Sequence, residues 1–276
     1  MNRVELNLNR FGSHGTRLLG RFVGERFPLY YVSEYPKSGG TWLGQMIADY
    51  LQIPFPQNNL LPIAHAAVIH NHWRYDPRLR RVFYLVRDGR DVMVSLFFHR
   101  MRHVRNARAA GVVHPFERTY RRVLGADFDP DDARRHLLPF MQHEVAHPVG
   151  CPVFWGAHVE QWAFDRPHVV LVRYEDLLRD GVGTLERALP THTGKAFDRG
   201  QAEMTVRKFS FERQTGRAKG AEDRTSFRRK GVAGDWVNHF SQEAATWFDR
   251  TCGSTLVKLG YAEDRAWTSL IAPSGA

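Results

Sequence analysis

The sequence predicts an α/β fold in which helices flank a central parallel sheet. Three short apolar stretches, at 27–33, 81–86 and 168–173, have the composition of buried strands. Each is followed by a polar loop and then by a segment whose apolar residues have helical spacing. Strands that alternate with helices are typical of parallel sheets. Ligands bind at the carboxyl ends of such strands, so we expect the three loops to converge on one site.

The first expected strand, Phe27–Ser33, leads into a loop with the composition of a phosphate cradle. Its glycines let the backbone approach an anion closely, and N–H groups at the start of the next helix, Thr41–Leu51, point toward that anion. Lys37 adds a charge, and Ser38 and Thr41 add hydroxyl groups. Lys37 precedes the glycines, whereas the triphosphatase loop GxxxxGK[ST] has its lysine after the second glycine. We therefore expect an anion site that does not rely on a magnesium–nucleotide complex.

The rest of the chain continues the alternation with two interruptions. Helices are expected at about Asp91–Arg100, after Tyr174–Asp176, and at Ser241–Leu259, where a serine can cap the first turn. His103–Pro148 breaks the pattern and predicts a helical cap or mobile insertion, and Arg213–Lys230 predicts a lid loop. We expect one domain, 1–276, with a core at about 27–102 and 153–262, a cap at about 103–150 and a lid at about 213–230.

The composition indicates a globular protein with an anionic partner. The 276 residues are 43% hydrophobic and 25% charged, which suits one sizeable globular domain. Lys and Arg number 39 against 29 Asp and Glu, and the net charge of +10 predicts an anionic partner. The excess is spread along the chain, with local runs at Arg100–Arg108 and Arg224–Lys230, whereas nucleic-acid binders usually concentrate it. Charge alone does not choose between nucleic acid, an anionic lipid and a phosphorylated small molecule. A nucleic-acid-binding protein would explain the charge but none of the motifs described in this section, so no nucleic acid is expected.

Targeting signals are not evident in the sequence. Met1–Gly20 has no apolar run, and no stretch approaches the roughly 20 apolar residues of a membrane span. Cys151 and Cys252 have no metal-binding spacing. We expect a cytoplasmic protein with no membrane span and no signal peptide.

Three segments, in the same order, resemble those of the cytosolic sulfotransferase family. Tyr35–Trp42 (YPKSGGTW) is similar to the family's 5′-phosphosulfate loop, and Arg87–Ser95 (RDGRDVMVS) is similar to its 3′-phosphate segment. Arg229–Ser241 (RKGVAGDWVNHFS) resembles the C-terminal segment RKGxxGDWxxxF and is the most specific match. Weaker matches are GAHVEQW, RYED, FSFE and LGY, so the resemblance spans about 28–261.

The resemblance implies a sulfotransferase fold that is P-loop-like. It also implies transfer of a sulfuryl group from 3′-phosphoadenosine 5′-phosphosulfate (PAPS) to a hydroxyl or amine of a small-molecule or glycolipid acceptor. The other product would be adenosine 3′,5′-bisphosphate (PAP). The implied PAPS-binding residues are Lys37, Ser38, Gly39, Gly40 and Thr41 at the 5′-phosphosulfate, Arg87, Ser95, Arg229, Lys230 and Gly231 at the 3′-phosphate, and Trp42, Phe211 and Tyr174 at the adenine, with Ser210 in the same FSFE segment.

The resemblance also implies a histidine base shortly before the 3′-phosphate strand, in a Lys-x-His sequence. His72 is assigned as this base, and His70 then stands where the family has its lysine. His65 and His70 are the alternative bases. By in-line displacement, His72 would take the acceptor proton while Lys37 stabilises charge on the bridging oxygen. Ser95 would hold Lys37 between turnovers, and no metal is expected.

Other readings explain less of the sequence. A P-loop kinase shares the strand–loop–helix order, but the place of Lys37 and the RKGVAGDW segment argue against it. His143–His147 (HEVAH) matches the zinc-protease pattern HExxH, yet Pro148 would end its helix and no second metal signature supports it. His70-Asn71-His72 as part of a metal pair is discounted as well. The acceptor pocket is expected around 97–148 and 213–228, and the family's dimerisation motif has no match in Val237–Trp247.

Overall fold

The computed structural model describes residues 3–26, 28–57 and 60–271. The chain divides into two units, of which the first comprises 1–86 and 161–214 and the second comprises 87–160 and 215–276. The expected single domain stays a prediction.

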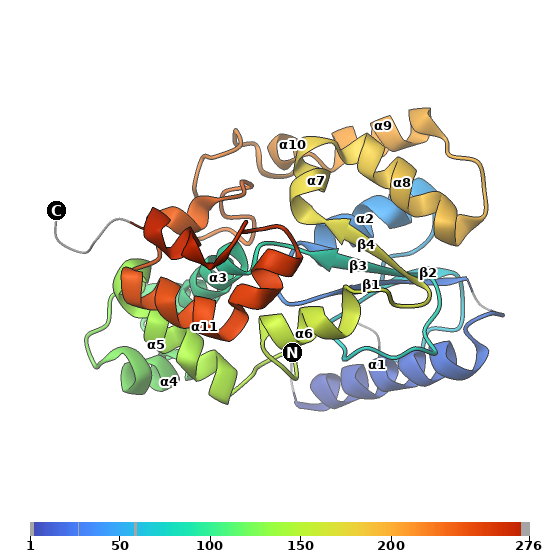
Figure 1. Cartoon of the computed structure of the whole chain (residues 1–276). Helices are drawn as coiled ribbons and strands as arrows, with labels where there is room; N and C mark the ends of the chain where they lie inside the picture. The colour runs from blue at the N-terminus through green and yellow to red at the C-terminus, as the bar shows by residue number, and fades with distance from the viewer. Residues whose placement is uncertain (1–2, 27, 58–59, 272–276) are drawn as a thin grey trace. The chain divides into compact units, whose positions relative to one another are not determined.

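The first unit contains a parallel sheet with the strand order β2-β1-β3-β4 (Figure 1). Its strands are β1 (Leu29–Glu34), β2 (Ala67–Asn71), β3 (Val82–Val86) and β4 (Val169–Arg173). β1, β3 and β4 are the three expected strands, and the parallel pairing confirms the predicted fold class. β2 was not expected. It pairs with β1 in a register that places Val32 opposite His70 and Ser33 opposite Asn71.

Helices cover both faces of this sheet, as Figure 1 shows. On one face lie α2 (Gly40–Leu51), α7 (Tyr174–Arg179), α8 (Gly181–Thr193) and α9 (Arg199–Lys208), with α10 (Phe211–Thr215) after them. Alternate strand residues point to this face, and Val32, Val68 and Phe83 are buried there against α2 and α8. α1 (Arg3–Val23) covers the other face, where Tyr84 stacks on Trp162 with ring centroids 5.7 Å apart.

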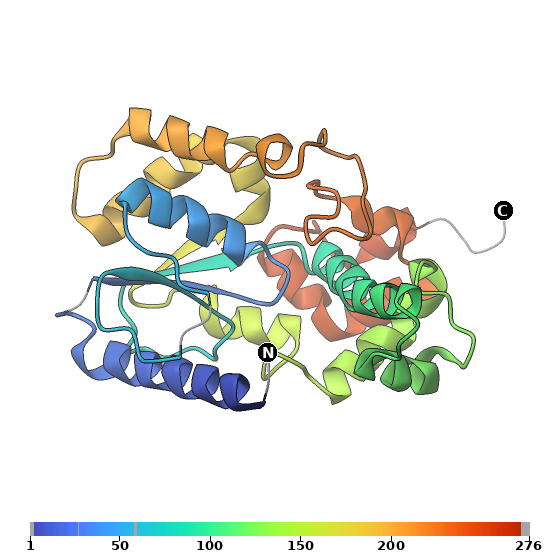
Figure 2. The ribbon, with the colours of Figure 1, turned by 180° about the vertical axis from the view of Figure 1, so that it is seen from behind.

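The second unit is largely helical. It contains α3 (Gly89–Ala109), α4 (Pro115–Leu124), α5 (Ala133–Ala146), α11 (Gln242–Lys258) and the 3-10 helices η1 (Asp235–Asn238) and η2 (Arg265–Leu270), while α6 (Trp155–Trp162) crosses the boundary. α3 packs against α4, α5 and α11 (Figure 2). Aromatic rings fill the interior of this unit, including Phe97 of α3 against Phe140 of α5 and Phe240 against Phe248 of α11, with centroid distances of 5.3 and 5.9 Å.

The segments predicted as a cap and a lid have these structures in the second unit. α4 and α5 lie in the segment predicted as a helical cap. Residues 216–230 of the predicted lid contain turns but neither helix nor strand. α11 begins as predicted, because the hydroxyl of Ser241 accepts a hydrogen bond from the Ala244 amide at 3.2 Å. Among the described residues, no helix is long and apolar enough to span a bilayer.

Candidate active site

The predicted phosphate loop joins the carboxyl end of β1 to the first turn of α2. Lys37 and Gly39 have φ values of 75° and 108°, a left-handed conformation that is unfavourable for a residue with a side chain and that is often found at functional sites. Ser38 is buried, and its hydroxyl has no hydrogen-bond partner among the residues that the structure describes. The first turn of α2 carries no acidic residue and no side-chain cap. Apart from the amide of Gly40, which donates to the Glu34 carboxylate, this helix start is therefore suited to an anion.

Aromatic residues assigned to the adenine meet beside this loop. The Trp42 indole N–H donates to the carbonyl of Phe209 at 2.7 Å, and the Trp42 and Tyr174 rings meet edge-on with centroids 5.8 Å apart. A Cβ atom on Gly39 would lie 2.8 Å from the Tyr174 ring, so only glycine fits there. Ser210 accepts from the amide of Arg213 at 3.3 Å, next to the assigned Phe211. Contact of these rings with adenine stays a prediction.

His72, the assigned base, is held by the residue at the end of β1. Its Nδ1 lies 3.0 Å from the carbonyl oxygen of Glu34. Because a carbonyl only accepts, Nδ1 carries the proton and Nε2 keeps its lone pair when the ring is neutral. Burial lowers the pKa of His72, and the charges of His70 and Lys37 lower it further against the opposing effect of Glu34. A base that is neutral near pH 7 follows from this environment.

The two alternative bases differ in their surroundings. His70 lies edge-on to His72 with ring centroids 4.9 Å apart, and its Nε2 donates to the Glu34 carboxylate at 2.9 Å. His65 is exposed, in the segment before β2. His70 and His72 are thus brought together, whereas His65 is exposed to solvent.

Glu34 is a site residue that the sequence reasoning missed. Its carboxylate is buried and also accepts a short hydrogen bond from the amide of Gly40. Burial alone would raise its pKa, but the hydrogen bond from His70 and the nearby histidine charges bring that pKa below the usual value. Its place directly before the loop was the one available signal. The contact itself depends on the pairing of β1 with β2.

Glu34, His70 and His72 are also residues of the type that bind metals. Their ligand atoms lie within 4.8 Å of one another, in the part of the chain that the structure describes. The expected absence of a metal therefore stays a prediction, which metal analysis of the purified protein can test.

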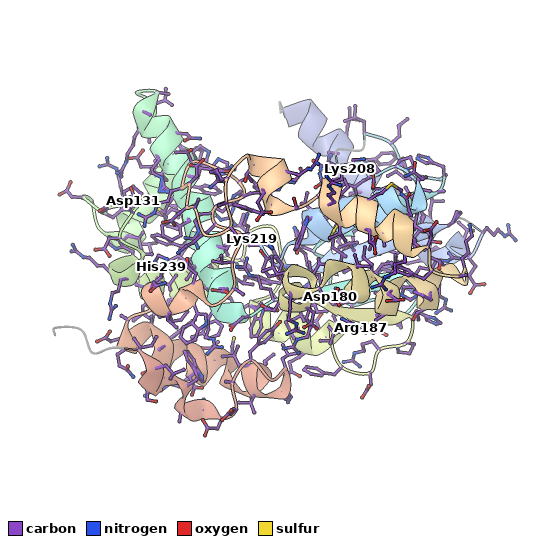
Figure 3. All side chains as sticks on the ribbon, turned by 90° about the horizontal axis from the view of Figure 1, so that it is seen from above. Asp131, Asp180, Arg187, Lys208, Lys219 and His239 are labelled. Carbon is purple, nitrogen blue, oxygen red and sulfur yellow. The ribbon has the colours of Figure 1, made fainter. Side chains whose placement is uncertain are left out.

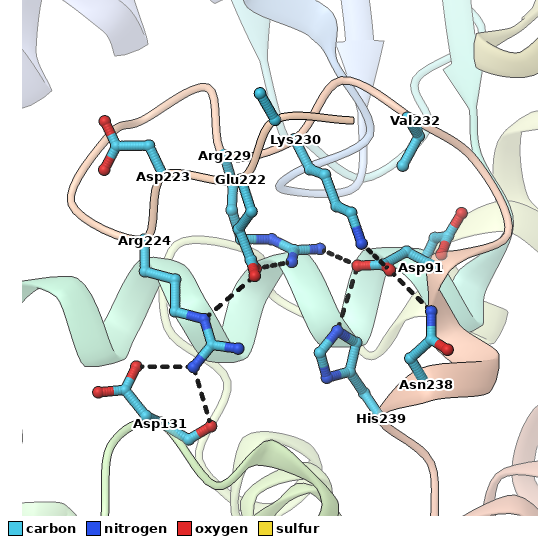
Figure 4. A network of polar contacts seen from close by, with 12 residues as sticks. Asp91, Asp131, Glu222, Asp223, Arg224, Arg229, Lys230, Val232, Asn238 and His239 are labelled. Carbon is cyan, nitrogen blue, oxygen red and sulfur yellow. Dashed lines mark hydrogen bonds and ion pairs between the residues drawn. The ribbon is translucent and has the colours of Figure 1, made fainter. Parts of the chain in front are cut away.

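In the second unit, residues assigned to the 3′-phosphate converge on the buried carboxylate of Asp235 (Figure 4). Arg229 and Lys230 each donate to Asp235 at 2.6 Å, and Arg229 also pairs with Glu222. His239 lies 3.1 Å from the same Asp235 carboxylate. Although burial would raise the pKa of Asp235, hydrogen bonds from these side chains hold it far below the usual range. The cations that a phosphate would need are already gathered in one place.

The start of α3 supports this cluster. Asp91 accepts hydrogen bonds from the amides of Gly234 at 2.7 Å and Trp236 at 3.0 Å. The guanidinium of Arg87 donates to the carbonyl of Val232 at 3.1 Å. The RKGVAGDW segment is thereby fixed to the helix that carries Ser95, which is partly exposed. No role was expected from the sequence for Asp91, Glu222, Asp235 or His239, although Asp91, Asp235 and His239 lie inside the motifs.

The HEVAH segment has a structural explanation. α5 ends at Ala146, before the second histidine. Glu144 is buried, where it accepts from the Tyr120 hydroxyl at 2.9 Å and lies 3.6 Å from the Arg100 guanidinium. Within the described ranges, no group of three metal ligands includes His143 or His147. The carboxylate that a zinc protease would use as a base is instead part of the packing of the cap.

Comparison with known proteins identifies the family. The model of the sulfotransferase domain family matches residues 75–260. The chain belongs to this family. Human sulfotransferase 2B1 is 24% identical to this sulfotransferase over 263 residues, covering 80% of the chain and 64% of its own length. Human sulfotransferase 1C2 is 25% identical over 271 residues, covering 79% of each.

Solved structures show the same fold. Mouse sulfotransferase SULT7A1, crystallised with PAP, aligns with a TM-score of 0.55 at 20% identity and covers 87% of this chain and 88% of its own. Retinol dehydratase, in complex with androsterone and PAP, aligns with a TM-score of 0.55 at 17% identity over 83% of this chain and 80% of its own. The expected sulfotransferase fold is confirmed, and these comparisons do not favour the kinase alternative.

Proposed function

We propose that this sulfotransferase uses PAPS, which supplies an activated sulfuryl group, and transfers that group to a hydroxyl or amine of a small molecule. The supporting observation is the loop between β1 and α2. There, the buried Ser38 hydroxyl has no partner among the described residues, and Lys37 lies beside it in the sequence. Both groups suit an oxyanion. The PAP complexes of the similar structures agree with this choice of nucleotide.

The residues of this chain would bind the two ends of PAPS and accept the proton of the acceptor. Lys37 to Thr41 would hold the 5′-phosphosulfate, and Lys37 would stabilise negative charge that develops on the bridging oxygen. The Nε2 atom of His72 would accept the proton of the attacking hydroxyl. The 3′-phosphate would be held by Arg87, Ser95, Arg229, Lys230 and Gly231.

Binding of PAP is the direct test of this proposal. Lys37→Ala should weaken PAP binding about tenfold or more, because a charge-assisted hydrogen bond typically contributes about 1.5–3 kcal/mol. Isothermal titration with and without EDTA measures the affinity and its independence of metal. Lys208→Ala is the matched control, because Lys208 (Figure 3) ends α9 and pairs with Asp49. Absence of binding by folded wild-type protein would refute the proposal.

The pH dependence of turnover tests the assigned base. His72 must be neutral to take a proton, so activity should rise as the pH increases through its pKa. Burial lowers that pKa, so the midpoint of the acid limb should fall below 6.5. A profile of kcat against pH for the wild-type protein measures this midpoint, and a His65 variant, which keeps His72, should show the same midpoint. A midpoint well above 6.5 would contradict the environment described for His72.

For the acceptor, we infer an apolar alcohol or phenol. Similar proteins include a 3-alpha-hydroxysteroid sulfotransferase, and retinol dehydratase was crystallised with retinol. In the second unit, rings of His103, His114 and Phe116 cluster with centroid distances between 4.9 and 5.8 Å. A screen of acceptors with labelled PAPS would test this choice. The cytoplasmic location stays a proposal from the sequence.

A further inference from the structure

The end of β1 presents an acidic residue to the same face of the sheet as His70. Val32 packs toward α2, so the alternation of strand residues places Glu34 on that face as well. On β2, Val68 packs toward α2, and His70 follows it two residues later. The parallel register thus brings Glu34 and His70 together in front of α2 without any contribution from loops.

Glu34 engages its neighbours with three separate groups. One carboxylate oxygen accepts from His70 at 2.9 Å, and the other accepts from the amide of Gly40. The main-chain carbonyl accepts from Nδ1 of His72 at 3.0 Å. One residue therefore orients the assigned base, the histidine beside it and the first turn of α2.

Residue 40 leaves room for this arrangement. A Cβ atom on Gly40 would lie 2.6 Å from the Glu34 carboxyl carbon and 2.7 Å from Nε2 of His70. Real Cβ atoms do not make contacts this short, so a side chain at this position would push the pair apart. The glycine, the glutamate and the histidine form one sterically linked set.

We propose that Glu34 is a positioning residue for sulfuryl transfer: its carboxylate holds His70 against His72, and its carbonyl keeps the proton of His72 on Nδ1. The proposal rests on the function proposed above for His72. When the acceptor proton moves to Nε2 of His72, the new imidazolium stays bonded to the Glu34 carbonyl and close to the Glu34 carboxylate.

Kinetics of Glu34→Gln, His70→Ala and the double variant test the proposal. Each single variant should lower kcat about tenfold or more while PAP affinity stays within about threefold. Since both substitutions remove one contact, the double variant should be no slower than the slower single variant. Asp76→Asn is the control, because Asp76 is an equally buried carboxylate in the first unit that pairs with Arg21 and Arg78. A kcat unchanged in folded Glu34→Gln, or losses that multiply, would overturn the proposal.

Histidine ¹⁵N spectra test the geometry separately from activity. In the wild-type protein, His72 should be protonated on Nδ1, and the signals of His70 should change in Glu34→Gln and in Gly40→Ala but not in Asp76→Asn. His70 signals that are unchanged in both variants would overturn the arrangement. This outcome does not depend on the kinetic measurements. If the wild-type protein fails to bind PAP while these spectra hold, the proposed function is wrong and the Glu34 arrangement stands.

Discussion

Replacing His72 by alanine is expected to lower the rate of sulfuryl transfer about 10²- to 10⁴-fold, the usual contribution of a general base. His72 is the histidine whose Nδ1 is engaged by a main-chain carbonyl, at 3.0 Å, so its Nε2 is the defined proton acceptor. No assigned contact of His72 involves the nucleotide. PAP affinity should therefore stay within about twofold of wild type, which separates loss of the base from loss of binding.

The measurement is transfer of label from PAPS to an acceptor found by the screen, with PAP titration of the same preparations. His65→Ala serves as the matched variant, because His65 is an alternative base that is exposed. It should retain full activity. A reversed result, with His65→Ala inactive and His72→Ala active, would show that the base had been assigned to the wrong residue.

Local sequence patterns were sufficient for much of the first unit. Strands β1, β3 and β4 are continuous apolar runs, and α2 has clear helical spacing, so each could be located to within about two residues. β2 (AVIHN) ends in two polar residues and is defined by its pairing with β1, which a single sequence does not reveal. α1 was not expected, although Leu8, Phe11, Leu18 and Phe22 recur at helical spacing. Among its described side chains these four are exposed, whereas Gly12, Thr16 and Gly20 are buried.

The candidate site was predictable where it depends on contiguous motifs. The phosphate loop and the RKGVAGDW segment are continuous stretches of sequence. In the structure, Arg229 of the second segment forms an ion pair with Asp235 of the same segment. The contacts of Glu34 with His70 join residues 36 positions apart and follow from strand register. The cluster at Asp235 could be located in sequence but not interpreted, because its donors come from both sides of a turn.

The second large effect is expected at this carboxylate. Asp235→Asn should lower the free energy of unfolding by about 3–5 kcal/mol, because the partly buried Arg229 and Lys230 lose a shared anionic partner that is itself buried. Asp235 is 5% exposed, and the side chains of Arg229 and Lys230 are 12% and 25% exposed, so water can replace little of the lost interaction. Urea unfolding followed by tryptophan fluorescence measures the change at pH 7. A loss below about 1 kcal/mol would mean that the pairs contribute little net stability.

The pH dependence of that difference gives an independent check. The pKa of Asp235 in the folded protein lies far below the ordinary value, so its contribution is complete above the pKa of an unfolded aspartate, about 3.9. The contribution is lost as the pH falls through the folded-state pKa. The free energies of unfolding of wild type and Asp235→Asn should therefore differ by a constant amount from pH 7 to about 5, and this difference should narrow only below about pH 4.

The control is Asp176→Asn, which removes an exposed ion pair with Arg179 and should change the free energy of unfolding by less than about 1 kcal/mol at every pH. A stability difference that already narrows between pH 7 and 5 would contradict the assignment of this effect to the Asp235 carboxylate.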